Sequence, residues 1–226
     1  MHSHRDYFLK HLGIGEIWQL RQPDSSAALV PDPSPDKGVL ASQRELSGER
    51  DDIAGLVNDV AQCAACSLCA SYGKHEDYSV RSQCDLVLLV DWSDQENLSP
   101  ELALQFERLA KNIASAAINL GLQVQLLPLL RSAIPTESIR IPLAESLVSC
   151  GSFLQRFLHL QRPKYVMSFG AHCASTTGVV EFANGTMGRL DWNGTSIFSF
   201  PSLYEVLRQG SLKRVVWQQL CHLASR

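Results

Sequence analysis

The chain has 226 residues, of which 45% are hydrophobic and 19% charged, and its formal net charge at pH 7 is −3. This length and composition are typical of a globular protein with one sizeable core, and they exclude the disordered and fibrous classes. The slightly acidic balance also excludes the strongly basic surface of a protein that holds nucleic acid by itself. We therefore expect contact with DNA only through a complex with other proteins.

The apolar runs of the sequence are short. The longest, residues 86–90 and 126–130, are far below the roughly 20 apolar residues that cross a bilayer, and residues 1–10 contain no apolar signal core. The sequence therefore predicts a cytoplasmic protein that makes no membrane contact.

The N-terminal part is predicted to be a short apolar peptide on a tether. Residues 1–23 gather the apolar side chains of Tyr7, Phe8, Leu12 and Trp18 in a segment too short to fold alone. Residues 24–50 contain PDPSPD and scattered Ser, Gly and charged residues, a composition that buries little apolar surface and indicates a flexible linker. Residues 51–226 form the predicted domain.

The domain begins with alternating helical and strand patterns. Continuous apolar residues predict a buried strand at 85–91. This strand is preceded by a predicted helix through Ile53, Leu56, Val57 and Val60. A long helix follows, with Ser99 as N-cap, Pro100 in the first turn and Gly121 at its end. Its buried stripe is predicted to be Leu102, Phe106, Leu109, Ile113 and Leu120.

The rest of the domain continues this order. Strands are predicted at 123–130, 164–169 and 195–199, with a turn at Pro201. Helices are predicted through Leu147, Leu154 and Leu158, and at the end through Leu212, Val215, Val216, Leu220 and Leu223. Such alternation favours a parallel sheet covered on both faces. The predicted fold is α/β, a three-layer αβα sandwich with a short, mostly parallel central sheet.

The N-terminal peptide resembles the psi-subunit family of the bacterial DNA polymerase III clamp loader. An Arg-Asp-aromatic opening, a Leu-Gly-Ile step and a Trp followed by Leu-Arg and Pro occur in the same order. The matching residues are Arg5, Asp6, Tyr7, Leu12, Gly13, Ile14, Trp18, Leu20, Arg21 and Pro23. The sequence VWQQLC at 216–221 also resembles the end of that family.

This resemblance implies a non-catalytic accessory subunit without a cofactor. In the psi-subunit family the peptide docks on the clamp-loader ATPase subunits gamma and tau, and a chi-like subunit links the complex to single-stranded-DNA-binding protein. The implied partner-binding residues are Arg5, Asp6, Tyr7, Phe8, Leu12, Ile14, Trp18, Leu20 and Arg21. An amphipathic arm packed on its own domain is the alternative, whereas a membrane-surface helix is disfavoured because Asp6 and Glu16 dilute its basic residues.

Residues 51–226 resemble the iron–sulfur uracil-DNA glycosylases. The sequence from Cys63 to Cys66 matches the opening cysteine pair of that family, and 162–170 matches its Arg-Pro-Lys strand with a glycine turn. Further elements in the family's order are Arg140-Ile141-Pro142, Cys150, Pro201-Ser202-Leu203, Val206-Leu207-Arg208 and Lys213-Arg214-Val215-Val216-Trp217. The resemblance implies a glycosylase-like fold. The alternative function is therefore a uracil-DNA glycosylase with a modified active site, acting in DNA repair.

Two departures from the glycosylase pattern argue against catalysis. Val90-Asp91-Trp92 stands where the family has a glycine-rich loop, and the bulk of Trp92 prevents close backbone approach to a nucleotide. Phe200 stands where the family has its active-site histidine. A phenyl ring donates no hydrogen bond to a base carbonyl and cannot stabilise a departing uracil anion. We therefore expect no uracil excision.

The chain has seven cysteines, which in a reducing compartment favour free thiols or metal ligands over disulfides. By resemblance, the third cluster cysteine is missing near 130–132, although a [4Fe–4S] cluster normally needs four thiolates. The candidate ligands are Cys63, Cys66, Cys69 and Cys150, with His75 as a fourth zinc ligand beside the first three. Buried structural thiols are favoured, while a zinc-stabilised interaction module and a residual cluster stay open.

Two other residue pairs could suggest a catalytic site but are better explained without catalysis. His172 and Cys173 are adjacent, and adjacent residues on a helix point about 100° apart, so we expect both to be packing residues. Asp91 and Glu96 follow a predicted strand, where carboxylates are expected to be solvated.

Overall fold

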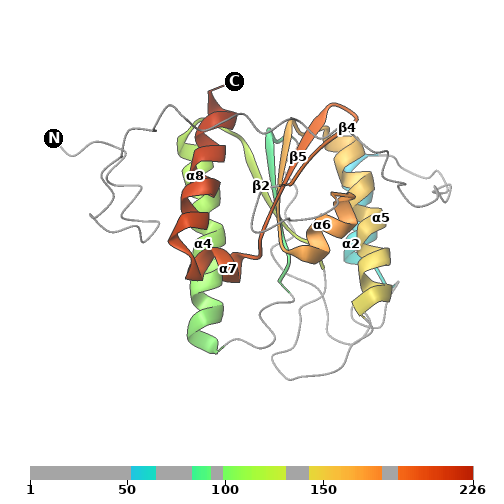
Figure 1. Cartoon of the computed structure of the whole chain (residues 1–226). Coiled ribbons are helices and arrows are strands. Elements are labelled where there is room, and N and C mark those ends of the chain that lie inside the picture. Colours follow the sequence, from blue (N-terminus) through green and yellow to red (C-terminus); the bar gives the residue numbers. More distant parts are fainter. Residues whose placement is uncertain (1–51, 65–82, 93–98, 131–142, 180–187, 226) are drawn as a thin grey trace.

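The computed structural model describes residues 52–64, 83–92, 99–130, 143–179 and 188–225. These residues form three layers, with a central sheet between two layers of helices (Figure 1). The predicted N-terminal peptide (residues 1–23) and linker (residues 24–50) lie outside the described residues, and Asp52 is the first described residue of the domain. None of the described helices is both long and apolar enough to span a membrane.

The sheet has five strands in the order β2-β1-β3-β5-β4. Their bounds are Leu86–Val90 for β1, Val124–Pro128 for β2, Tyr165–Phe169 for β3, Gly188–Trp192 for β4 and Thr195–Phe200 for β5. All neighbouring pairs are parallel except β4 and β5, which are antiparallel. The predicted α/β fold with a mostly parallel sheet between helices is confirmed.

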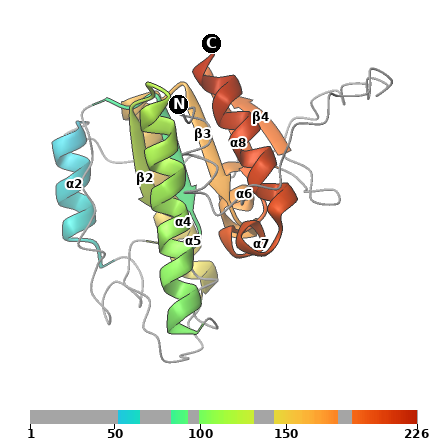
Figure 2. The same cartoon turned by 90° about the vertical axis from the view of Figure 1, so that its left-hand side faces the viewer.

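Each face of the sheet is covered by helices. One layer contains α4 (Pro100–Asn119), α7 (Leu203–Arg208) and α8 (Gly210–Ala224), and the other contains α2 (Ile53–Ala61), α5 (Leu143–Gln161) and α6 (Ala171–Thr177) (Figures 1 and 2). Successive side chains of a strand point to opposite faces of the sheet. Because helices cover both faces, β1 has to be apolar on both. Leu86, Leu88 and Val90 accordingly pack toward α4 and α8, whereas Val87 and Leu89 pack toward α5.

The connections create a reversal in the middle of the sheet. The crossover through α4 leads from β1 to β2 on one side, and the crossover through α5 returns past β1 to β3 on the other side. Right-handed crossovers in opposite directions place α4 and α5 on opposite faces. The carboxyl ends of β1 and β3 therefore flank a topological switch point, where open α/β sheets bind their ligands.

The predicted boundaries of the long helix are confirmed. The Ser99 hydroxyl accepts a hydrogen bond from the Leu102 backbone N–H at 3.4 Å, and Pro100 occupies the first turn. Gly121 follows the helix with φ +91°, a conformation that glycine adopts without strain. Of the predicted stripe, Phe106, Leu109 and Ile113 are buried, while Leu102 and Leu120 are half-buried.

The C-terminal region differs from the prediction. It contains two helices, because α7 begins at a capping box in which Ser202 and Glu205 satisfy each other's backbone N–H groups. Val215 was expected in the buried face of the last helix but is 36% exposed. It lies about 100° around the helix from Val216, which is buried, and Gln219 takes a buried position instead.

A polar clamp joins the amino ends of three strands. The Asp85 carboxylate accepts a hydrogen bond from the Gln123 backbone N–H at 3.1 Å and pairs with Lys164 Nζ at 3.0 Å. The backbone N–H of Gln123 and then the hydrogen bond from Lys164 hold the pKa of Asp85 below its usual value. The charged form of Asp85 is therefore favoured by folding.

We predict that Asp85→Asn removes a pH-dependent part of the stability. A carboxyl group with a lowered pKa stabilises the fold above its unfolded pKa of about 3.9, and this stability is lost as the pH falls through the folded pKa. Because Lys164 is 71% exposed, we expect a loss of about 1 kcal/mol or less at pH 7. Urea unfolding should show this difference between parent and variant shrinking toward pH 3.

The matched control is Glu107→Gln, which breaks the exposed Lys111–Glu107 pair on α4. It should change the unfolding free energy by only a few tenths of a kcal/mol. An Asp85→Asn variant as stable as the parent at pH 7 would show that the contacts of Asp85 with Gln123 and Lys164 contribute nothing to the stability.

Candidate functional site at the carboxyl edge of the sheet

The carboxyl ends of β1, β3 and β5 bring together three segments that the glycosylase resemblance singles out. They begin at Val90, Phe169 and Phe200. Val90 lies opposite Phe169, and Phe169 lies opposite Phe200. The ladder continues one step further, because Asp91 N–H donates to Phe169 O at 3.2 Å and Gly170 N–H donates to Phe200 O at 3.1 Å. The site-bearing positions after these strands are therefore neighbours in space.

Phe200 is part of the core. Its side chain is 1% exposed and stacks on Phe169, with ring centroids 5.2 Å apart and an interplanar angle of 20°. Both rings belong to the cluster beneath α4, α7 and α8. An aromatic ring in this position is held by burial and stacking, so it presents no polar atom toward the carboxyl edge.

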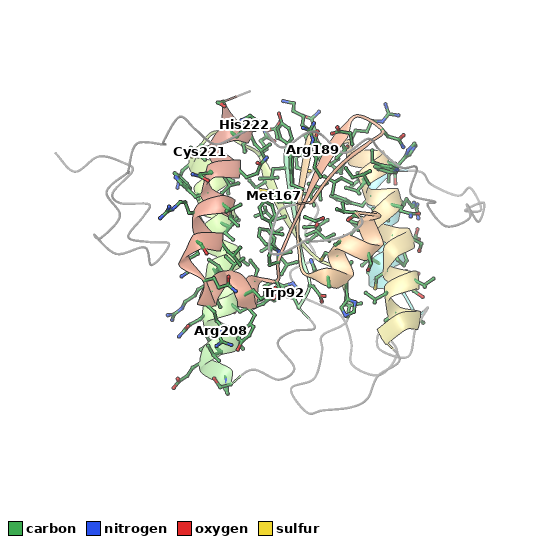
Figure 3. The ribbon with its side chains drawn as sticks, viewed as in Figure 1. Trp92, Met167, Arg189, Arg208, Cys221 and His222 are labelled. Carbon is green, nitrogen blue, oxygen red and sulfur yellow. The ribbon has the colours of Figure 1, made fainter. Side chains whose placement is uncertain are left out.

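Trp92 packs against the same layer. Figure 3 shows it at the end of the sheet beside α7. Its ring lies 5.1 Å from that of Phe106 on α4, at an interplanar angle of 52°. The indole therefore covers the end of the apolar cluster at the place where a nucleotide-binding loop would need small residues.

Asp91 is buried, contrary to the expectation of a solvated carboxylate. It is 2% exposed, because it continues the ladder beyond β1 and falls on the same side of the sheet as Leu89. The alternation of β1, extended by one residue, is the sequence signal that would have predicted this. Glu96, its proposed companion, lies outside the described residues.

Gly170 makes the position of Asp91 possible. A Cβ atom on Gly170 would lie 2.9 Å from Asp91 Cβ, and the glycine has φ +106° and ψ 155°. Both the close approach and the backbone conformation exclude other residues without strain. The glycine turn after β3 therefore holds Asp91 against the start of α6.

Other polar groups lie buried on the α6 side of the sheet. The hydroxyls of Ser168 and Ser199 are 2.6 Å apart on neighbouring strands, and both residues are fully buried. The Cys173 thiol lies 3.8 Å from Leu89 O and is also fully buried, which confirms its expected packing role. His172 is half-buried and follows the turn at Gly170. The sequence analysis did not identify the serine pair, since single serines in apolar strands carry no specific signal.

The cysteines give no evidence of a metal centre in the part of the chain that the structure describes. Cys63 follows α2 and Cys150 lies on α5, and these helices pack together through an ion pair between Asp59 and Arg156. Among the described residues no three His, Cys, Asp or Glu side chains are grouped to hold a metal. Cys66, Cys69 and His75 lie outside those residues, so the zinc and cluster hypotheses stay untested.

Cys84, which with Cys69 is a possible substitute for the missing third cluster cysteine, lies just before β1. Burial, and secondarily the charge of Asp85, raise the pKa of its thiol to about 11. The thiolate is the reactive form, so the raised pKa disfavours reaction of this cysteine at neutral pH.

The candidate partner-binding residues lie outside the described residues. They are Arg5, Asp6, Tyr7, Phe8, Leu12, Ile14, Trp18, Leu20 and Arg21. The same holds for the Arg140-Ile141-Pro142 element of the glycosylase resemblance.

Comparison with known proteins does not assign the chain to a family. No protein-family model matches it, and a search of curated proteins finds no significant relative.

We predict that Gly170→Ala lowers the free energy of unfolding by about 3 kcal/mol. The new methyl group meets Asp91 and forces a backbone conformation available almost only to glycine. The control is Gly121→Ala, which has a similar φ of +91° but no atom within 4 Å of the added Cβ. It should cost about 1 kcal/mol in a urea titration. Equal losses in the two variants would show that the contact with Asp91 is unimportant.

Proposed function

We propose that the chain is a non-catalytic accessory subunit of the bacterial DNA polymerase III clamp-loader complex. Its N-terminal peptide binds the ATPase subunits gamma and tau, and its α/β domain binds a chi-like subunit that reaches single-stranded-DNA-binding protein. The protein meets DNA only as part of this complex, in the cytoplasm.

The observation that carries the non-catalytic part of the proposal is the burial of Phe200 on Phe169. Glycosylases extract a base from the duplex into a pocket and stabilise the departing base by hydrogen bonds. At this carboxyl edge the described side chains from β5 and the loop after β1 instead extend an apolar core. A filled edge supports a scaffold whose role is to bind other proteins.

The clamp-loader part of the proposal rests on residues 1–23. These residues match the psi-subunit family in order and spacing, and they include the aromatic side chains of Tyr7, Phe8 and Trp18. Tryptophan and tyrosine are the residues on which binding energy most often concentrates in protein interfaces. A short peptide with such anchors suits docking on a larger partner.

We predict that Trp18→Ala weakens binding to the clamp-loader ATPase complex at least about tenfold. Truncation of a buried interface anchor costs about 2 kcal/mol or more, and every 1.4 kcal/mol corresponds to a factor of ten in affinity. The melting temperature should stay nearly unchanged, because residues 24–50 separate the peptide from the domain in sequence. Surface plasmon resonance and calorimetry measure the two quantities.

The neighbouring change Gln19→Ala is the control and should leave the affinity unaltered. Normal binding by Trp18→Ala would contradict the proposal. A melting temperature several degrees lower in that variant would instead indicate an arm packed on its own domain.

A second candidate is a uracil-DNA glycosylase with a modified active site, and the burial of Asp91 favours it. A buried carboxyl group beside a topological switch point is the kind of residue that catalytic sites use. Phe200 and Trp92, which stand where a glycosylase has its histidine and its glycine-rich loop, argue against a base-binding site, so this function ranks second.

We predict that the purified protein forms no abasic sites in uracil-containing single- or double-stranded DNA above a buffer control. Phe200→His should not restore excision, because Trp92 still occupies the loop after β1. Asp91→Asn is the diagnostic variant. Excision by the parent that disappears in Asp91→Asn would establish the glycosylase instead of the scaffold.

A further inference from the structure

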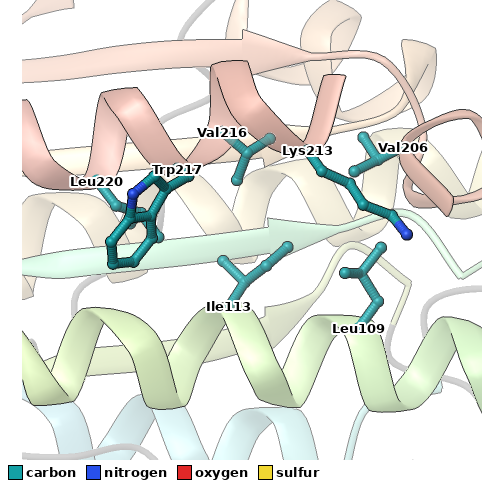
Figure 4. A pocket seen from close by; sticks show the side chains of 7 residues that line it. All are labelled: Leu109, Ile113, Val206, Lys213, Val216, Trp217 and Leu220. Atoms are coloured by element: carbon teal, nitrogen blue, oxygen red, sulfur yellow. The ribbon is translucent and has the colours of Figure 1, made fainter. Parts of the chain in front are cut away.

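The helices α4, α7 and α8 pack closely on one another. They leave a crevice of about 10 Å³, which is the space of one water molecule (Figure 4). Its apolar lining is at most 5% exposed and consists of Leu109, Ile113, Val206, Val216 and Leu220. The edges of the sheet differ from this layer, because a strand there has a neighbour on only one side and its outward N–H and C=O groups can pair with another chain.

The two edge strands are not equally available. In β2, at one edge, Val124, Gln125 and Leu127 are buried. The Gln125 side-chain amide donates to Leu126 O at 3.2 Å, and Pro128 has no N–H to offer. At the opposite edge, β4 has no fully buried residue, and within the described part of the chain β5 is the only strand paired with it (Figure 2). The edge at β4 is therefore the better place for a further strand to add.

The turn of the β4–β5 hairpin determines which backbone groups of β4 point outward. A two-residue Asn-Gly loop is closed by a hydrogen-bonded pair, here Trp192 and Thr195. Hydrogen-bonded and non-hydrogen-bonded pairs then alternate along an antiparallel ladder, so the pair at Leu190 is again of the hydrogen-bonded kind. The N–H and C=O groups of Arg189 and Asp191 therefore point away from β5, toward the outer edge.

The two outward residues carry opposite charges. The Arg189 guanidinium pairs with the Asp191 carboxylate at 3.1 Å, and their side chains are 51% and 61% exposed. Arg189 also lies over the ring of Phe198, 5.7 Å from its centroid, and the Ser196 hydroxyl donates to Asp191 at 2.6 Å. Strand β5 thus holds both charged groups on one face of the sheet. Charges of a single sign would repel a second copy of an edge strand, whereas this strand has one of each sign.

These features make β4 complementary to itself. When two β4 strands pair antiparallel about a two-fold axis at Leu190, Arg189 of each copy lies opposite Asp191 of the other. The outward N–H and C=O groups belong to these same residues, so they meet as hydrogen-bonded pairs with opposite charges across each pair. On the other face Leu190 meets its own copy. Trp192 there lies opposite Gly188, which has no side chain to obstruct the indole.

We propose that two copies of this chain associate through their β4 strands, in an antiparallel pair centred on Leu190. The contact joins the two five-stranded sheets into one continuous sheet, and Arg189 and Asp191 of both copies form a cluster of four alternating charges. Two strands of five residues bury much less than the roughly 1,600 Å² of a standard interface, so the dimer is weak and depends on concentration. It requires only β4 and is independent of the proposed clamp-loader role.

The test is analytical ultracentrifugation of the full chain at concentrations up to about 1 mM. The parent should sediment as a reversible mixture of monomer and dimer. Arg189→Asp and Asp191→Arg each place like charges opposite one another, so each variant alone should have a dimer dissociation constant at least about tenfold above that of the parent. An equimolar mixture of the two variants should form the dimer again, because one strand is then acidic and the other basic.

Two further variants serve as controls. The double exchange of Arg189→Asp with Asp191→Arg restores opposite charges across the axis and should dimerise like the parent. Lys111→Glu reverses an exposed charge on α4, away from β4, and should leave the dissociation constant unchanged. Far-UV circular dichroism should show the same helix content in every variant, because the exchanged side chains are more than half exposed.

Three results would overturn the proposal. A parent that stays monomeric at every concentration would show that β4 does not pair with a second copy, and would leave this edge to a strand of another protein. A dimer that neither single variant weakens would lie elsewhere on the surface. Folded single variants that stay monomeric when mixed would show that Arg189 does not lie opposite Asp191 of the other copy.

Discussion

The architecture depends on burying both faces of the central strands. All five residues of β1 are apolar and buried, so neither face of this strand can lie against water. The two crossovers from β1 and β2 satisfy this requirement by placing α4 and α5 on opposite faces. The same arrangement produces the switch point between the carboxyl ends of β1 and β3. The candidate site is thus a geometric consequence of how the core is covered, and its chemistry depends on the residues that follow each strand.

At this edge the chain uses its side chains for packing. A buried aromatic side chain contributes roughly 2 to 3 kcal/mol from the apolar area it removes from water. Phe169, Phe200 and Phe106 are all fully buried in the cluster that Trp92 borders. A catalytic pocket would need the same space for water and polar groups, which would remove part of this stabilisation. The buried polar groups Asp91 and Ser168 lie on the other side of the sheet, where Gly170 packs against Asp91 and Cys173 of α6 is also buried.

The sequence predicts those elements whose signals are local. The helix from Pro100 follows from its cap and its apolar stripe, and β1 follows from an uninterrupted apolar run. The sequence analysis predicts β5 but not β4, its partner in the hairpin. Asn193 and Gly194, with φ values of 48° and 86°, form the Asn-Gly turn that is typical of hairpins. The burial of Asp91 and the exposure of Val215 depend on strand register and helix rotation against neighbours, which hydrophobic periodicity alone does not determine. The contact of Phe200 with Phe169 likewise depends on the pairing of β3 with β5.

Several basic side chains of the described domain are held in ion pairs. Lys111, Arg156, Lys164 and Arg189 each pair with a nearby carboxylate, so a large share of the positive charge of the described domain is already compensated. Binding to duplex DNA draws its affinity from several phosphate contacts that release counterions, and paired cations release few. At physiological salt the screening length is about 8 Å, so the charges of these ion pairs act only on groups that lie close to them.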